Sequence, residues 1–326
     1  MRISEEQVET LRQEGSSGPQ AGTQAPGVVE PCPEPTFREN VILIGSEMQY
    51  DSFWLKMMFI AAGYRLALSN TYRQGDRKTI AYVDVGYVRP EKLPLETLKD
   101  QYGYRLVVLN SSADVVKLFN DRPRIEVGGR SGKLLLHYVA FFCHGVPGKI
   151  ALNYNASPAV DVTESQVSAM NADIFDPQGR ITSYACRTGN STLWESFNND
   201  AEAKPEASLA QKMADRFKVS VFAYLKRTFY GNVLRDPSDS EKISSALKEA
   251  RKTQEGSIID IPDEHEALPH PGLAAGGVFG FGSATVKEGT NGYALWRKGG
   301  GRTLPTAAET PKGLSGNLRE FKPRGS

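Results

Sequence analysis

Short apolar runs rich in β-branched residues alternate along the chain with segments in which apolar residues recur every three or four positions. Side chains alternate across a strand and recur every 3.6 residues on a helix, so these patterns predict strands and helices respectively. Their alternation predicts an α/β fold with a mainly parallel sheet covered on both faces. The expected strands lie within 40–46, 78–88, 104–110, 133–142, 148–154, 179–186 and 218–225, and the expected helices within 52–64, 94–103, 112–121, 163–172 and 208–217.

The two ends of the chain have a different composition from the middle. Residues 15–37 are rich in Pro, Gly, Ser and Gln, which is typical of a linker. We therefore expect a disordered or linker segment over 1–37 and an ordered core over 38–235. Residues 236–326 predict a C-terminal extension that is partly ordered, with one polar helix at 239–256 and a basic, mobile tail.

Charge and cysteine content exclude several classes of protein. The 39 Lys and Arg nearly balance the 38 Asp and Glu, so no global field favours nucleic acid. Three cysteines without a Cys-x-x-Cys spacing argue against a disulfide framework and a structural zinc site, and fit a reducing compartment. The polar N-terminus does not resemble a signal peptide, and the longest apolar stretch contains Lys56 and Arg65. We expect no membrane span and synthesis in the cytoplasm, with delivery by a route independent of a signal peptide left open.

Two expected strands end in residues with nucleophile chemistry. The run "YVAFFCHG" ends at His144 and Gly145, and the run "ITSYAC" ends at Cys186. A right-handed crossover between neighbouring parallel strands brings both ends to one edge of the sheet, where ligands of open α/β sheets bind. A thiol needs a base that takes its proton, so this pairing predicts a catalytic His144–Cys186 dyad. The backbone N–H groups of Gly145 and Cys186 are the candidate oxyanion donors.

The other histidine and cysteine near this edge have simpler explanations. Cys143 is next to His144, but alternation along the strand turns it to the opposite face, into the core. His137 lies seven residues earlier in the same strand and is expected to be a buried or edge histidine. A metal site at Cys143, His144 and Cys186 would lack a fourth ligand, so neither a metal nor a cofactor is predicted.

The motifs "AFFCHG" and "SYACRTG" resemble the His-Gly and Ala-Cys motifs of caspase-like (clan CD) cysteine peptidases, which include caspases, metacaspases and bacterial CHAT domains. The resemblance covers about residues 38–235. It implies a three-layer sandwich, a dyad without a required third carboxylate, a thioester intermediate and cleavage after one charged residue type. Tyr184 departs from the pattern: caspases have Gln there and metacaspases have Asp. Neither specificity therefore carries over.

Residues that could recognise the substrate are weakly marked. Lys226 and Arg227, with Tyr224 as a wall, suit an acidic side chain before the cleaved bond, whereas Asp173 and Asp176 suit a basic one. The sequence leaves this choice open. The polar loop after the nucleophile contains Asp200 and Lys204, two candidate sites of self-cleavage.

The sequence as a whole favours a cysteine endopeptidase. Effector toxins and proteases of defence or cell-death pathways are the expected settings for it. Its expected partners are a protein or peptide substrate and an activating or inhibitory protein. A catalytically degenerate binding or scaffold module and another Cys/His acyl transferase or amidase remain alternatives.

Overall fold

The computed structural model describes residues 34–48, 56–231, 233 and 303–325. The described residues from Pro35 onward belong to one compact unit. Its central sheet is parallel except where β13 joins β10 and where β4 joins β5, so the predicted mainly parallel sheet is confirmed. The strand order is β13 (Arg319–Phe321), β10 (Ser220–Ala223), β9 (Phe175–Ser183), β5 (Arg130–Phe142), β1 (Thr36–Ile44), β2 (Arg77–Val83), β3 (Arg105–Leu109), with β4 (Arg124–Val127) on β5.

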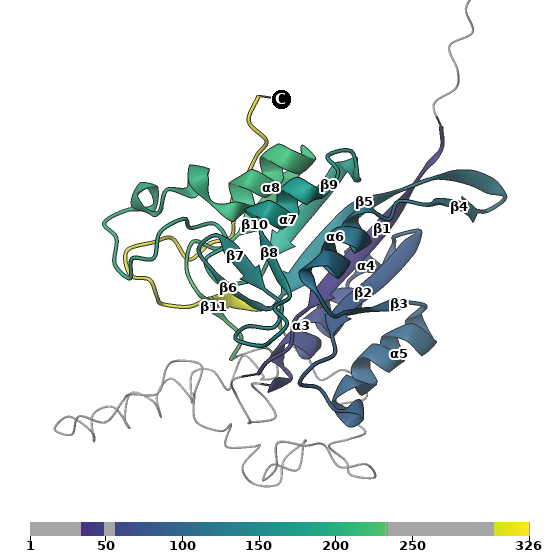
Figure 1. Ribbon diagram of the computed structural model, residues 1–326, viewed down its shortest axis with the longest axis horizontal. Helices are drawn as coiled ribbons and strands as arrows, with labels where there is room; N and C mark the ends of the chain where they lie inside the picture. The colour runs from purple at the N-terminus through teal and green to yellow at the C-terminus, as the bar shows by residue number, and fades with distance from the viewer. Residues whose placement is uncertain (1–33, 49–55, 232, 234–302, 326) are drawn as a thin grey trace, which may run out of the picture. The chain divides into compact units, whose positions relative to one another are not determined.

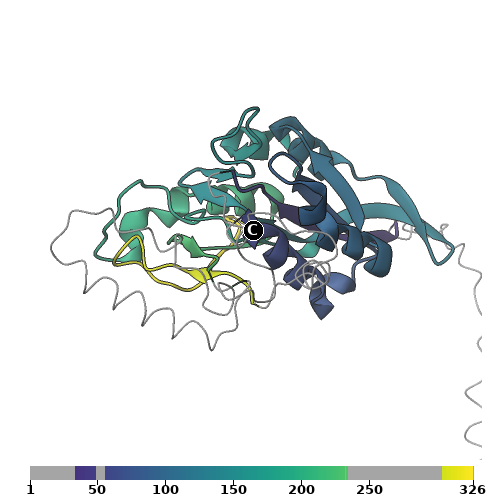
Figure 2. The ribbon, with the colours of Figure 1, turned by 90° about the horizontal axis from the view of Figure 1, so that it is seen from below.

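Helices cover both faces of the sheet (Figures 1 and 2). Along β1, Val41 and Leu43 pack into one hydrophobic cluster while Ile42 and Ile44 pack into the other, because successive side chains leave opposite faces. One cluster includes α6 (Ser112–Asn120), α7 (Glu164–Ala169) and α8 (Leu209–Phe217), and the other includes α3 (Met58–Ala67), α4 (Asn70–Arg73) and α5 (Leu93–Tyr102).

Helix ends follow signals that are visible in the sequence. The Ser111 side chain accepts a hydrogen bond from the Asp114 N–H at the start of α6, and Thr163 with Gln166 forms the predicted capping box of α7. Gly103 ends α5 in the left-handed conformation, with φ of +69°, which glycine adopts without a steric cost. These local signals place the helices that lie between the strands.

The C-terminal segment corrects one prediction. Residues 303–325 are not a mobile tail: β12 (Thr306–Ala307) pairs with β11 (Thr228–Phe229), and β13 pairs antiparallel with β10. Phe321 is buried in the core, and Arg324 forms an ion pair with Asp215. A three-residue strand with one buried side chain has no periodicity that sequence reasoning could detect. The helix expected at 239–256 lies outside the described residues.

A small antiparallel sheet lies beside the end of β5. It contains β6 (His144–Val146), β7 (Lys149–Ala151) and β8 (Asp161–Thr163), and His144 is the first residue of β6. The chain therefore leaves the central sheet at Cys143 and enters the small sheet at His144. None of the helices in the described part of the chain has the length and apolar character needed to cross a membrane.

Candidate active site

The two strands that end in His144 and Cys186 are neighbours. β5 pairs parallel with β9, and the Tyr184 N–H donates to the Phe141 carbonyl at 2.9 Å, so both strands end at the same edge. A Cβ on Gly145 would lie 2.5 Å from the Cys186 carbonyl oxygen and 3.0 Å from its nitrogen. Only glycine permits this approach of the two backbones. The expected adjacency of the strand ends is confirmed, and the catalytic roles remain predictions.

His144 is oriented by three neighbours. Its Nε2 lies 2.5 Å from Oε2 of Glu47, whose side chain is fully buried. The ring also packs edge-on against Phe59, with centroids 5.1 Å apart, and against Tyr154 at 5.4 Å. A carboxylate on Nε2 favours the tautomer with its proton there, which leaves Nδ1 as the nitrogen that can accept a proton.

Glu47 is a site residue that the sequence analysis missed. It follows β1, which runs parallel to β5 and ends at the same edge of the sheet. The segment "ILIGSE" has the form of the other two strand ends: an apolar strand, small residues, then a polar side chain. The strand-end rule applied to β1 would have found Glu47, whereas the family resemblance required no third carboxylate.

Cys186 lies half-buried directly after β9, against the segment that follows β10. The Thr228 N–H donates to Cys186 Sγ at 3.2 Å, and the Arg187 N–H donates to the Lys226 carbonyl at 2.9 Å. A donor on sulfur stabilises the thiolate over the thiol. Arg187 has φ of +56°, an unusual conformation for a residue with a side chain and one that occurs preferentially at functional sites.

The structure separates this pair from the other cysteine and histidine of the region. Cys143 is fully buried, and this burial raises the pKa of its thiol well above the ordinary value, so its assignment to the core is confirmed. His137 is buried earlier in β5 with Nδ1 3.2 Å from Asp176 Oδ1, and burial lowers its pKa. Both observations leave His144 and Cys186 as the reactive candidates.

Unsatisfied polar atoms gather at this edge. Most buried polar atoms in proteins have a hydrogen-bond partner, so an exception calls for an explanation. The described residues contain five such exceptions, and three of them lie at this edge: Ser46 Oγ, Arg187 Nε and Thr228 Oγ1. Ser46 is next to Glu47 in the chain, Arg187 is next to Cys186, and the Thr228 N–H donates to the Cys186 sulfur. The other two are Ser69 Oγ and Arg122 Nε. A bound ligand at this edge would give these atoms partners.

Lys226 and Arg227, the two cationic candidates, lie in the segment that contacts Cys186 and Arg187. Arg227 Nη1 and Nη2 donate to the two carboxylate oxygens of Glu195 at 2.5 and 2.9 Å, and Arg187 Nη1 donates to the same carboxylate at 2.8 Å. Hydrogen bonds from Arg227 are the main cause that lowers the pKa of Glu195. Lys226 Nζ donates to the Glu309 carbonyl at 3.1 Å. The edge therefore binds a carboxylate between two guanidinium groups.

Tyr184 and Tyr224, the expected walls of a pocket, lie in the core. Both are buried in the hydrophobic cluster that contains α3. The Tyr184 ring stacks on Phe142 with centroids 4.7 Å apart, and the Tyr224 hydroxyl donates to the Pro305 carbonyl at 3.4 Å. Both side chains pack between the central sheet and the helices on this face, and they support the strand ends there.

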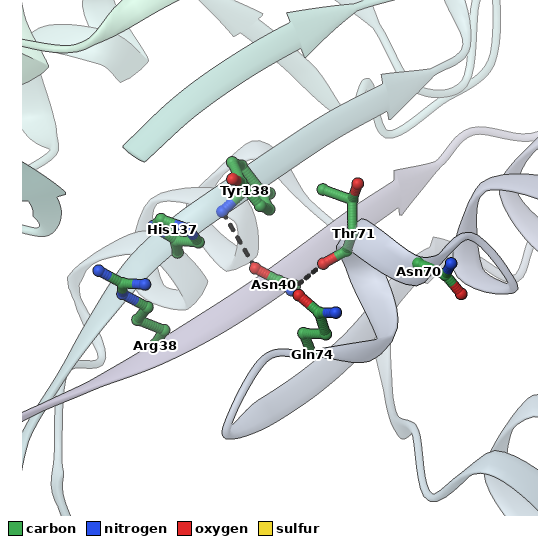
Figure 3. Close-up of a pocket in the computed structure, with 7 residues that line it drawn as sticks. All are labelled: Arg38, Asn40, Asn70, Thr71, Gln74, His137 and Tyr138. Carbon is green, nitrogen blue, oxygen red and sulfur yellow. Dashed lines mark hydrogen bonds between the residues drawn. The ribbon is translucent and has the colours of Figure 1, made fainter. Parts of the chain in front are cut away.

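Asp173 and Asp176 were wrong candidates for the substrate pocket. They lie at the start of β9, where Asp173 binds Lys133 and Asp176 binds Arg38 and His137. The five residue steps along β5 from the pair Leu136–Phe175 to the pair Phe141–Ser183 correspond to about 17 Å along the sheet, away from Cys186. His137 and Arg38 line a pocket of about 280 Å³ in this remote region (Figure 3).

The two candidate self-cleavage residues lie in short turns. Asp200 begins η2 (Asp200–Ala203) and accepts a hydrogen bond from the Ser315 N–H at 2.7 Å. Lys204 is exposed between η2 and η3 (Pro205–Ala207), with φ of +48°. Peptidases bind extended chain, so cleavage at either residue requires local unfolding. Self-cleavage stays a prediction.

Comparison with known proteins gives no family for this chain. No family model matches it, and no curated protein or solved structure matches it either. Within the described ranges, no three His, Cys, Asp or Glu side chains are arranged to hold a metal ion. The chemistry of the site has to be argued from its own residues.

Proposed function

We propose that the protein is a cysteine endopeptidase that uses Cys186 as nucleophile and His144 as general acid and base, with Glu47 positioning His144. The observation that carries this proposal is the convergence of three parallel strand ends. A buried carboxylate binds His144 Nε2, the Cys186 sulfur accepts a backbone N–H, and the backbones of Gly145 and Cys186 are in close contact. The similarity to caspase-like peptidases is part of the proposal.

The reaction follows from these positions. Cys186 gives its proton to Nδ1 of His144, and the sulfur attacks the carbonyl carbon of the peptide bond. The N–H groups of Gly145 and Cys186, whose backbones lie close together, are the proposed donors that stabilise the oxyanion. His144 then donates the proton to the leaving amine, which leaves a thioester on Cys186. A water molecule, deprotonated by His144, hydrolyses the thioester and returns the thiol.

The charge around Cys186 favours an acidic residue before the cleaved bond. Glu195 already places a carboxylate between Arg187 and Arg227. Arg187 directly follows Cys186 in the chain, and Arg227 directly precedes Thr228, whose N–H donates to the Cys186 sulfur. A substrate carboxylate that exchanged with Glu195 would receive the same charge-assisted hydrogen bonds. The acidic candidates Asp173 and Asp176 lie at the far end of β9, so they provide no pocket for a basic residue here.

Two experiments on the full chain test the proposal. Labelling with iodoacetamide, read by peptide mass spectrometry, is expected to modify Cys186 and spare the buried Cys143. Profiling with a library of fluorogenic peptide amides is expected to show one dominant, acidic preference before the cleaved bond. Unreactive Cys186 together with no hydrolysis would favour a scaffold module, and turnover of simple amides or acyl donors without a residue preference would favour an amidase or acyl transferase.

Replacing Glu47 by glutamine is expected to lower kcat/KM on the order of 100-fold, because the tautomer and orientation of His144 lose their support. Glu91→Gln is the control, since Glu91 is equally buried but binds Lys56. A loss in Glu47→Gln that is no larger than the loss in Glu91→Gln would show that Glu47 has only a structural role.

Replacing Arg227 by glutamine is expected to lower kcat/KM for peptides with Asp or Glu before the cleaved bond by about 10- to 100-fold. Peptides with Asn or Gln at that position should be affected much less, because a neutral amide forms no ion pair with the guanidinium. Arg216→Gln is the control, since Arg216 donates to the carbonyls of Ser168 and Met170, away from Cys186. An equal loss for acidic and neutral peptides would contradict the role of Arg227.

A further inference from the structure

We propose that Leu193 and Trp194, called here the Leu193–Trp194 ridge, bind an apolar side chain of the peptide substrate next to the nucleophile. The inference rests on the proposed function and adds a second requirement to it, an apolar residue near the cleaved bond. The ridge lies on the loop that follows Cys186.

The Arg187 side chain, which directly follows Cys186 in the chain, holds the backbone of this loop. Arg187 Nη2 donates to the carbonyls of Thr192 and Trp194 at 2.6 and 2.8 Å, and its Nη1 donates to the Glu195 carboxylate. Arg187 is itself 4% exposed. The position of the ridge is thus tied to the conformation of the chain at Cys186.

The far end of the loop is fixed by the C-terminal segment. The Lys312 N–H donates to the Glu195 carbonyl at 3.0 Å, and the Phe197 N–H donates to the Lys312 carbonyl at 3.1 Å. Ser196 and Lys312 form a parallel bridge between these bonds. Leu193 and Trp194 are therefore the exposed apolar residues of a loop that is held on both sides.

Their side chains are open to solvent to an unusual degree. Leu193 is 74% exposed and Trp194 is 57% exposed, the highest values of the large hydrophobic side chains in the described ranges. The Trp194 ring packs against the buried Phe197 with centroids 6.0 Å apart, which limits its orientation. Exposed apolar area that is held in a fixed orientation loses little entropy on binding, which favours recognition.

The size of the ridge decides its occupant. Two partly exposed side chains offer on the order of 200 to 300 Å², whereas stable protein–protein interfaces bury about 1,200 Å² or more. The ridge is too small for a dimer of this chain by itself. It suits one or two apolar side chains of an extended peptide whose next residues reach Cys186, and Trp is a residue type that often dominates such contacts.

Binding to the full chain with Cys186→Ala tests the inference without turnover. Fluorescein-labelled hexapeptides with an Asp before the cleaved bond would carry either Leu or Ser at one of the three preceding positions, and fluorescence anisotropy would give Kd. Leu at one of these positions is expected to lower Kd about 10-fold relative to Ser. Trp194→Ser and Leu193→Ser, each added to Cys186→Ala, should reduce this ratio to about 2-fold or less.

Val108→Ser is the matched control, because Val108 is 41% exposed on the edge strand β3, at the other side of the sheet. Equal binding of the Leu and Ser peptides, including no binding of either, would overturn the inference, as would an unchanged ratio in both ridge variants. A dimer that Trp194→Ser dissociates, seen by light scattering, would also overturn it in favour of a second copy. A Leu preference in Cys186→Ala together with no peptide hydrolysis by the wild-type chain would reject the proposed function and keep the ridge.

Discussion

Cys186→Ala is expected to lower kcat/KM for the best library peptide by at least about 10³-fold. The thioester cannot form without the sulfur. His144→Ala should cause a loss of similar size. The double variant should be no worse than either single variant, because the two residues act as a unit. Peptide hydrolysis followed by fluorescence, with the folded state checked by circular dichroism, measures the effect.

His137→Gln is the matched control for the histidine. His137 lies on the same strand β5, but it is bound to Asp176 away from the strand ends. We expect its kcat/KM to stay within about 3-fold of the wild-type value, as for a residue outside the reacting unit. Full activity in Cys186→Ala, or equal losses in His137→Gln and His144→Ala, would contradict the assignment of the dyad.

Glu39→Ala is expected to lower the free energy of unfolding by about 3 to 5 kcal/mol. Glu39 is fully buried in β1, and its carboxylate accepts hydrogen bonds from Arg77 at 2.8 and 3.0 Å, from Arg122 at 2.7 Å and from Thr79 at 2.6 Å. Its removal leaves the guanidinium of Arg122, with a side chain that is 4% exposed, buried without its counter-charge. Urea unfolding monitored by circular dichroism measures the loss.

The exposed pair of Arg89 and Glu96 provides the control. Its side chains are 87% and 42% exposed, with 4.0 Å between the charged atoms, so Glu96→Ala should change the free energy of unfolding by less than about 0.5 kcal/mol. Similar losses in Glu39→Ala and Glu96→Ala would contradict the importance of the buried network.

The same network predicts a dependence of stability on pH. Burial by itself raises the pKa of Glu39, but hydrogen bonds from Arg77 and the charges of Arg122 and Arg77 outweigh it and lower the pKa from the ordinary 4.5. The unfolded chain then binds more protons than the folded one as the pH falls below 4.5. This contribution to stability is present at neutral pH and is lost as the pH falls through the folded pKa. The difference in stability between wild type and Glu39→Ala should therefore shrink on acidification.

The candidate dyad could be predicted from the sequence. His144 and Cys186 could be selected because each follows an apolar strand, and because parallel strands with a crossover end at the same edge. Glu47 follows the same rule but belongs to a strand end 97 residues before His144, and a glutamate after a Gly-Ser pair has many ordinary explanations. Its role became visible only through its contact with the imidazole.

The residues around the candidate pocket could not be predicted from the sequence. Asp173 and Asp176 precede the nucleophile by only 13 and 10 residues, yet β9 carries them to the opposite end of the sheet. Arg187, Glu195 and Arg227 meet through side chains that cross from one strand end to the next. Sequence distance has no direct relation to such contacts.

The sequence by itself determined the alternation of strands and helices, the helix caps at Ser111, Thr163 and Gly103, and the edge at which His144 and Cys186 meet. These features depend on local periodicity and on the geometry of parallel sheets, which act over a few residues or a single crossover. Only the tertiary structure decided the partner of His144, the carboxylate between the two guanidinium groups, and the place of β13 at the sheet edge. Those features depend on burial and on contacts between distant segments, which the pattern of hydrophobic and polar positions along the chain does not predict.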